Sequence, residues 1–358
     1  MNTRLQRLLT PVAALLALFG LQGCSTLDYY GHLAVGQAQL LQARQPIAQL
    51  LADPAVDPEL KQRLALAQQA RDFASAELGL PDNGSYRLYA DIQRPYVVWN
   101  VFATPEFSLT PELHCFPIAG CVAYRGFYSQ GRARGAAALL KQQGLDTYQA
   151  GIEAYSTLGW FDDPILNTML RWSDERLVAV IFHELAHQQL YVADDTAFNE
   201  SFASFVEQQG LRQWRTEQNL PAQDPQGEQQ RAQFSALVLA SRARLEQLYR
   251  SGLPAEQMRA GKQAEFARLR QHYAELRERE WGGVGHYDGW INAPLNNAKL
   301  LPFGLYDQWV PAFAALFAQA GGVWTQFYPR VEALAQLPSA EREQALQQLS
   351  AQAQNLRR

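Results

Sequence analysis

Residues 171–210 read RWSDERLVAVIFHELAHQQLYVADDTAFNESFASFVEQQG and contain His183-Glu184-Leu185-Ala186-His187, an H-E-x-x-H pattern. Ser173 is suited to cap the N-terminus of a helix, and apolar residues recur after it at helical spacing. Because His183 and His187 are four residues apart, both imidazoles leave the same face of this predicted helix. Two imidazoles one turn apart are a ligand pair for zinc.

A catalytic zinc ion needs a third protein ligand and an open fourth position. Glu200 follows His187 by thirteen residues and lies near the start of a second segment with helical periodicity, 198–206. A loop over 192–196 allows this second predicted helix to fold back against the first. His183, His187 and Glu200 then match the ligand set of catalytic rather than structural zinc.

Glu184 lies beside the first histidine, where it can take a proton from a zinc-bound water and pass it to a leaving amine. Zinc lowers the pKa of such a water to about 7 and polarises the scissile carbonyl. A plainer interpretation makes the motif the polar face of a buried helix, with both histidines hydrogen-bonded in the core. Its position inside a helical pattern, followed by Glu200, favours the metal site.

The run H-E-L-A-H followed by F-N-E-S-F-A resembles the gluzincin class of zinc peptidases. More closely, the chain is similar over most of its length to a bacterial family of predicted zinc-dependent aminopeptidases, which are predicted lipoproteins. The similarity extends to the segments 98–102, 115–117, 154–160 and 296–298. The resemblance implies one zinc ion per chain, a peptide substrate, and the same ligands and general base as above.

The sequence departs from the gluzincin pattern one turn after Glu200. Many gluzincins carry an acid there to orient the first histidine, whereas this chain has Ser204. Glu207, a further turn along the helix, is the candidate to take over that role toward His183.

The first residues resemble the leader of an exported bacterial lipoprotein. Arg4 and Arg7 precede an apolar run, 8–20, that is too short to span a bilayer comfortably. Leu21-Gln22-Gly23-Cys24 resembles a lipobox, which implies cleavage before Cys24, acylation of Cys24 and anchoring in a membrane. Ser25 resembles the signal for outer-membrane sorting, so we expect an outer-membrane protein that faces the periplasm. The alternative is an ordinary secreted precursor with Cys24 unmodified.

The chain has three cysteines, an odd number for an exported protein. If lipidation uses Cys24, then Cys115 and Cys121 remain. They flank a short loop that a disulfide can close in an oxidising periplasm.

Composition sets the class and the domain organisation. The 358 residues are 47% hydrophobic with a formal net charge of −4, which argues against nucleic-acid binding. The glycines at 282, 283 and 285 follow no predicted strand, so no nucleotide-cofactor loop is expected. We predict a signal peptide over 1–23, an N-terminal helical segment over 24–84, a metal-site core over 85–220 and a helical C-terminal lobe over 221–358.

Periodicity predicts an α+β, mainly helical fold. The core is expected to be zincin-like: a small mixed sheet, the H-E-x-x-H helix and the glutamate helix. Predicted helices cover 28–52, 58–78, 132–143, 231–280 (a hairpin) and 309–356, and an exposed loop covers 215–230. Predicted strands cover 86–90, 96–102, 122–128 and 147–156.

The last predicted strand, 152–157, is expected to be a sheet edge that binds the substrate backbone, with Ala154, Tyr155 and Ser156 lining the cleft. The alternative is an ordinary core strand. An aminopeptidase also needs a group that holds the free amine of its substrate, and Glu153 and Glu207 are the candidates.

Zinc peptidases generally need a hydrogen-bond donor for the tetrahedral oxyanion, often a Tyr or His across the cleft. Tyr287, Tyr306 and His286 in the C-terminal half are the candidates. The sequence thus predicts zinc-dependent hydrolysis of peptide bonds, with aminopeptidase activity favoured by the resemblance alone. The alternatives are a non-catalytic zinc-binding lipoprotein that serves as a scaffold or binding module, and an amidase or endopeptidase acting on cell-wall peptides.

Overall fold

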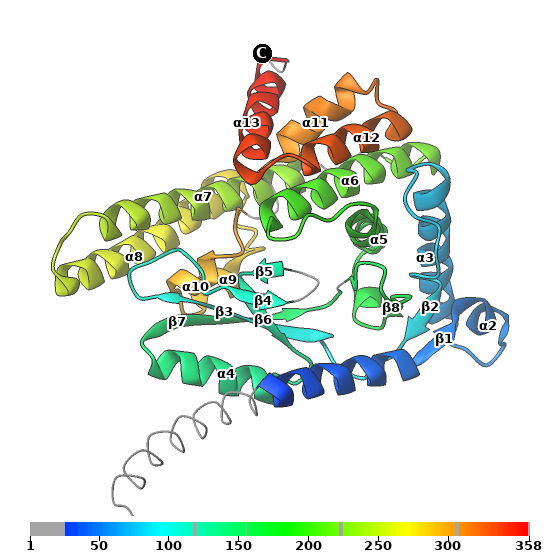
Figure 1. Cartoon of the computed structure of the whole chain (residues 1–358), viewed down its shortest axis with the longest axis horizontal. Helices are drawn as coiled ribbons and strands as arrows, with labels where there is room; N and C mark the ends of the chain where they lie inside the picture. The colour runs from blue at the N-terminus through cyan, green and yellow to red at the C-terminus, as the bar shows by residue number, and fades with distance from the viewer. Residues whose placement is uncertain (1–25, 117–119, 155, 222–224, 305–307, 357–358) are drawn as a thin grey trace, which may run out of the picture.

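The computed structural model describes residues 26–116, 120–154, 156–221, 225–304 and 308–356. The predicted signal peptide and three residues with predicted roles, Cys24, Tyr155 and Tyr306, lie outside these ranges. The described chain is mainly helical with three small sheets, as the predicted α+β class requires (Figure 1). Among the described residues, no helix combines the length and the apolar composition that crossing a membrane requires.

The predicted helix over 28–52 is interrupted. Residues 26–42 are helical, but β1 (Arg44–Pro46) separates them from α2 (Ile47–Ala52). β1 pairs antiparallel with β2 (Leu88–Ala90), and this pairing with a distant strand breaks the helix. The helix α3 (Pro58–Ala76) follows as predicted, and the carboxylate of its N-cap Asp57 accepts hydrogen bonds from two backbone N–H groups.

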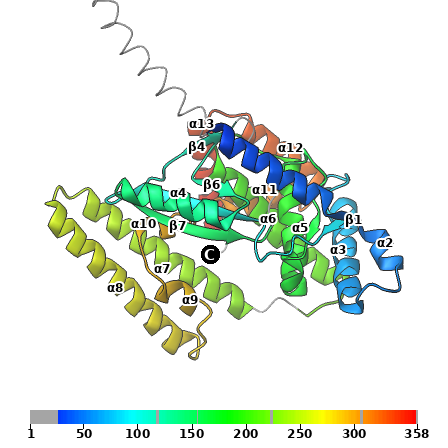
Figure 2. The ribbon, with the colours of Figure 1, turned by 90° about the horizontal axis from the view of Figure 1, so that it is seen from below.

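One three-stranded sheet in the described residues is purely antiparallel. Its order is β6-β3-β7, formed by Tyr124–Phe127, Val98–Pro105 and Leu145–Ile152. The helix α4 (Gln130–Gln142) packs on this sheet, as both views show (Figures 1 and 2). The other sheets are the small mixed sheet β1-β2-β8, with β8 at Ile165–Leu166, and the hairpin of β4 (His114–Phe116) and β5 (Gly120–Val122).

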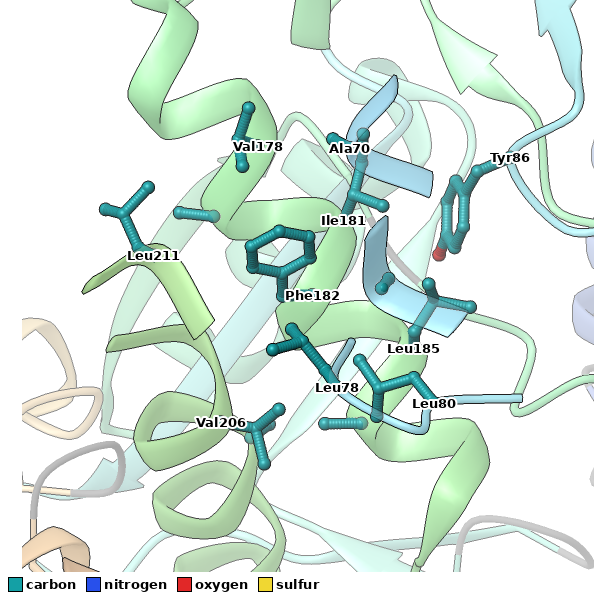
Figure 3. Packing of buried hydrophobic residues seen from close by; sticks show 14 of the residues in the cluster. Ala70, Leu78, Leu80, Tyr86, Val178, Ile181, Phe182, Leu185, Val206 and Leu211 are labelled. Atoms are coloured by element: carbon teal, nitrogen blue, oxygen red, sulfur yellow. The ribbon is translucent and has the colours of Figure 1, made fainter. Parts of the chain in front are cut away.

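The two predicted metal-site helices are α5 (Asp174–Gln189) and α6 (Thr196–Glu217), which pack against each other. Phe182, Ile181 and Leu185 of α5 are fully buried against side chains of α3 and of the segment that follows it (Figure 3). Burial of such side chains contributes about 1.5–3 kcal/mol each, so the α5 backbone is firmly held.

The predicted helical hairpin consists of α7 (Pro225–Tyr249) and α8 (Ala255–Glu280). The two helices contribute to a hydrophobic core separate from the main one. The ammonium group of Lys262 on α8 lies 2.6 Å from the Asp146 carboxylate of β7, which joins the hairpin to the antiparallel sheet. Two short helices follow, α9 (Asp288–Asn292) and α10 (Asn297–Leu300).

The C-terminal helices are α11 (Val310–Gln319), α12 (Trp324–Ala335) and α13 (Ser339–Leu356), so the predicted segment 309–356 is divided into three. Their apolar side chains belong to the same core as α3, α5 and α6. This core crosses both predicted domain boundaries, at 84 and at 220. The boundaries therefore stay predictions, since packing does not separate the chain at either point.

Candidate metal centre

The helix α5 begins where the sequence predicts. The Ser173 hydroxyl accepts a hydrogen bond from the backbone N–H of Arg176, and Asp174 and Glu175 occupy the positive end of the helix. His183, Glu184 and His187 are all buried in its second half. The helix therefore presents two imidazoles and a carboxyl group inside the protein.

The loop between α5 and α6 positions Glu200. The amide side chain of Asn199 bonds both the backbone N–H and the C=O of Val192, at 2.8 and 2.7 Å. Asp195 caps α6 by accepting from the Phe198 N–H, and its carboxylate also accepts from Arg342 of α13 at 2.8 Å. The loop is thus tied to both helices and to the C-terminus.

His183, His187 and Glu200 form a compact triangle of ligand atoms. The two histidine Nε2 atoms are 3.2 Å apart, and Glu200 Oε2 lies 3.4 Å from His183 Nε2 and 3.7 Å from His187 Nε2. Ligands at about 2.0–2.1 Å from one tetrahedral ion are separated by roughly 3.3 Å. The triangle therefore fits one zinc-sized ion.

Glu207 lies behind this triangle. Its Oε2 is 2.9 Å from Nδ1 of His183, which leaves His183 Nε2 directed at Glu200. Nδ1 of His187 is buried with no hydrogen-bond partner among the described residues. Ser204 is buried on α6 and no hydrogen bond joins its side chain to the described residues, so the contact to the first histidine is made by Glu207.

The charges of the site act on one another. Burial raises the pKa of Glu200, but His187 and His183 outweigh burial and hold it well below its usual range. Burial lowers the pKa of His183, yet its hydrogen bonds to Glu200 and Glu207 leave it raised well above the ordinary value. The carboxylates thus stabilise positive charge at the position between the ligand atoms. A divalent cation bound there would be stabilised by the same negative charges.

Burial also raises the pKa of Glu184, and the two nearby imidazoles oppose this shift. A carboxyl group whose pKa is raised accepts a proton more readily than an ordinary glutamate. Glu184 is therefore suited to the role of general base.

A family model described as "Putative aminopeptidase" matches residues 28–346. The chain belongs to this family. No curated protein and no solved structure matches it. Membership implies a peptide substrate, while the assignment of individual site residues rests on the geometry described above.

Two residues near Glu184 were not among the sequence candidates. Burial raises the pKa of Tyr124 on β6, and the charges of Glu200 and Glu184 raise it further, so its phenol is near enough for both carboxylates to act on it electrostatically. Burial also raises the pKa of Asp163, to about 6, and Glu184 adds to this shift. Neither residue belongs to a recognisable motif, so no local signal in the sequence singles them out.

The predicted substrate strand is wrong in its extent. β7 ends at Ile152, so Ala154 and Ser156 lie in the loop that follows the strand rather than on a sheet edge. Ser156 remains near the site through Asp163, whose Oδ2 is 3.5 Å from its hydroxyl. The edge strand β6 carries Tyr124, whose phenol is affected by the charge of the predicted ligand Glu200.

The two predicted amine anchors have other partners. Glu153 accepts a hydrogen bond from the indole N–H of Trp172 at 2.8 Å, and Glu207 contacts His183. Each carboxylate therefore already makes one structural contact, and their role toward a substrate amine stays a prediction.

Of the predicted oxyanion donors, Tyr287 packs within the hairpin core, and Tyr306 lies outside the described residues. Tyr287 stacks on Phe234 of α7 with ring centroids 3.8 Å apart and also contacts Trp281, so its ring contacts are within the hairpin core. His286, the residue before it, shows no hydrogen bond to the metal ligands within the described ranges. The packing of the hairpin, which periodicity does not reveal, keeps Tyr287 in this separate core.

The predicted disulfide between Cys115 and Cys121 is present and joins β4 to β5. The backbone N–H of Cys121 donates to Asp194 Oδ1 at 2.6 Å, and Asp194 belongs to the loop between α5 and α6. The cross-linked hairpin is thus attached to the loop that separates His187 from Glu200. Cys121 precedes Tyr124 by three residues in the chain.

Proposed function

We propose that this protein is a zinc-dependent peptidase of the aminopeptidase type, with His183, His187 and Glu200 as ligands. The observation that supports this most strongly is the triangle of 3.2, 3.4 and 3.7 Å between the ligand atoms, with the Glu184 carboxyl beside it. Preference for aminopeptidase over endopeptidase activity comes from family membership.

A zinc ion held by His183, His187 and Glu200 would lower the pKa of a bound water and would polarise the carbonyl of the scissile bond. Glu184 accepts the proton from the attacking water and delivers it to the leaving amine. Glu207 holds His183 in the ligating orientation through Nδ1. The phenol of Tyr124, beside Glu184 and Glu200, donates a hydrogen bond to the oxyanion that develops from the substrate carbonyl.

The variant Glu184→Gln tests this function. It should keep zinc, measured by elemental analysis, and lose turnover of aminoacyl amides and of free and N-blocked peptides. Glu217→Gln, an exposed residue at the end of α6, is the matched control and should keep both properties. Wild-type rates in Glu184→Gln, or a zinc-loaded wild type without hydrolysis of any of these substrates, would contradict the proposal.

We also propose that the mature protein is anchored by acyl chains on Cys24 in an outer membrane, facing the periplasm. The Cys115–Cys121 bridge supports this, because it leaves Cys24 as the single cysteine of an odd set. In a bacterial host fed labelled palmitate, the full chain should become labelled and sediment with the outer membrane. Cys24→Ala should remove both the label and the sedimentation, and an unlabelled wild type would exclude the anchor.

A further inference from the structure

The segment 156–163 lies along the face of α5 that carries Glu184. Asp163 is close enough to Glu184 for the two charges to influence each other. At the other end of the segment, a Cβ added to Gly159 would lie 3.7 Å from Oε1 of Gln188. Since Glu184 and Gln188 are one helical turn apart on the same face, the segment borders the side of the site that holds the general base.

Hydrogen bonds within the segment fix its shape. The Thr157 N–H and hydroxyl each donate to the Asp163 carboxylate at 2.8 Å. The Phe161 N–H donates to the Thr157 hydroxyl at 3.1 Å, and the Trp160 N–H donates to the Thr157 carbonyl at 3.1 Å. Leu158 and Gly159 have φ values of 57° and 81°, which such a tight turn requires.

The turn directs two large aromatic residues into solvent. Trp160 is 66% exposed and Phe161 is 45% exposed, and they are the only consecutive pair of exposed large hydrophobic residues within the described ranges. Single exposed apolar residues are common, but an aromatic pair held on a segment that borders the Glu184 face of α5 indicates a binding surface. Aromatic rings bury a large apolar area when a second side chain packs on them.

We propose that Trp160 and Phe161 form an apolar platform that binds the side chain of the substrate residue next to the scissile bond. The platform gives the enzyme a preference for large apolar residues at that position. This inference rests on the proposed peptidase function, because the position of the scissile bond is inferred from the position of Glu184. The occupant is a peptide side chain, since the segment that carries the platform borders the face of α5 with Glu184.

The test compares Trp160→Ala, Phe161→Ala and the double variant with wild type. Two series of peptides place Phe or Ala on either side of the cleaved bond. In the series whose varied residue occupies the platform, the ratio of kcat/KM for the Phe peptide over the Ala peptide should fall about ten-fold or more in the double variant. Rates on the Ala peptide should change little. Leu139→Ala, which truncates an exposed apolar residue on α4, is the control and should keep the wild-type ratio.

Binding of the same peptides to the Glu184→Gln protein, measured by calorimetry, tests the platform without turnover. Weaker binding of the Phe peptide after both aromatic residues are removed supports the platform even if the reaction is not the one proposed. An unchanged Phe-to-Ala preference in both assays overturns it. Loss of binding to phosphatidylcholine vesicles together with unchanged peptide preference would assign the pair to a membrane contact and also overturn it.

Discussion

His183 Nδ1 and Glu207 Oε2 lie 2.9 Å apart, and this contact connects the first predicted ligand on α5 to the glutamate helix α6. It fixes the ring of His183 so that Nε2 faces Glu200. His187 has no corresponding partner for its Nδ1 among the described residues. The orientation of the His183 ring therefore depends on Glu207.

Replacing Glu207 with Ala should weaken zinc binding about 10–100-fold, because His183 loses the group that orients it. Competition with a fluorescent chelator measures the affinity. Glu217→Ala, an exposed glutamate later on α6, is the control and should bind as the wild type does. Equal affinities in both variants would show that Glu207 does not support the site.

Removing a ligand should remove the metal. We expect about one zinc per chain in wild type, with strongly reduced content in His187→Ala and Glu200→Ala, since two protein ligands hold zinc poorly. Elemental analysis after dialysis measures this content. His272→Ala on α8 controls for the loss of a histidine elsewhere. A folded wild type that takes up no zinc would be incompatible with the proposed centre.

Tyr124→Phe should lower kcat about 10²–10³-fold, because it removes a donor to the developing oxyanion. KM and zinc content should stay near wild type, since the ring and its packing against Phe102 are retained. Tyr148→Phe is the matched control, because Tyr148 also packs against Phe102 but belongs to β7. A wild-type kcat in Tyr124→Phe would exclude Tyr124 from the reaction.

Asp163 should make stability depend on pH. Burial raises its pKa to about 6 from 3.8, so the folded protein binds a proton more tightly than the unfolded chain. This group therefore stabilises the fold below about pH 4, and the contribution is lost as the pH rises through about 6. This change in pKa corresponds to roughly 3 kcal/mol in the free energy of unfolding.

Urea unfolding of the chelator-treated protein between pH 4 and 7 checks this prediction. The Asn side chain in Asp163→Asn cannot ionise. The stability of this variant relative to wild type should therefore rise as the pH increases from 4 to 7. Asp162→Asn, at the exposed neighbouring position, should show no such trend. A constant difference between wild type and Asp163→Asn across the range would contradict the prediction.

The sequence by itself determined the features that depend on spacing along one element. Helical periodicity places His183 and His187 on one face of α5, and Ser173 marks where that helix begins. Periodicity also predicted the hairpin of α7 and α8, whereas the ligand needs of zinc pointed to Glu200 and the cysteine count to Cys115 and Cys121. These features are local, since residues a few positions apart in a helix or hairpin meet whatever the rest of the chain does.

Only the tertiary structure decided which distant residues join the site. Tyr124 lies far before α5 in the chain, and the fold brings its phenol within reach of the charge of Glu200, while hairpin packing keeps Tyr287 in another core. The predicted helix over 28–52 breaks because β1 pairs with β2. Such contacts depend on how separate elements pack, and periodicity within one element carries no information about that packing.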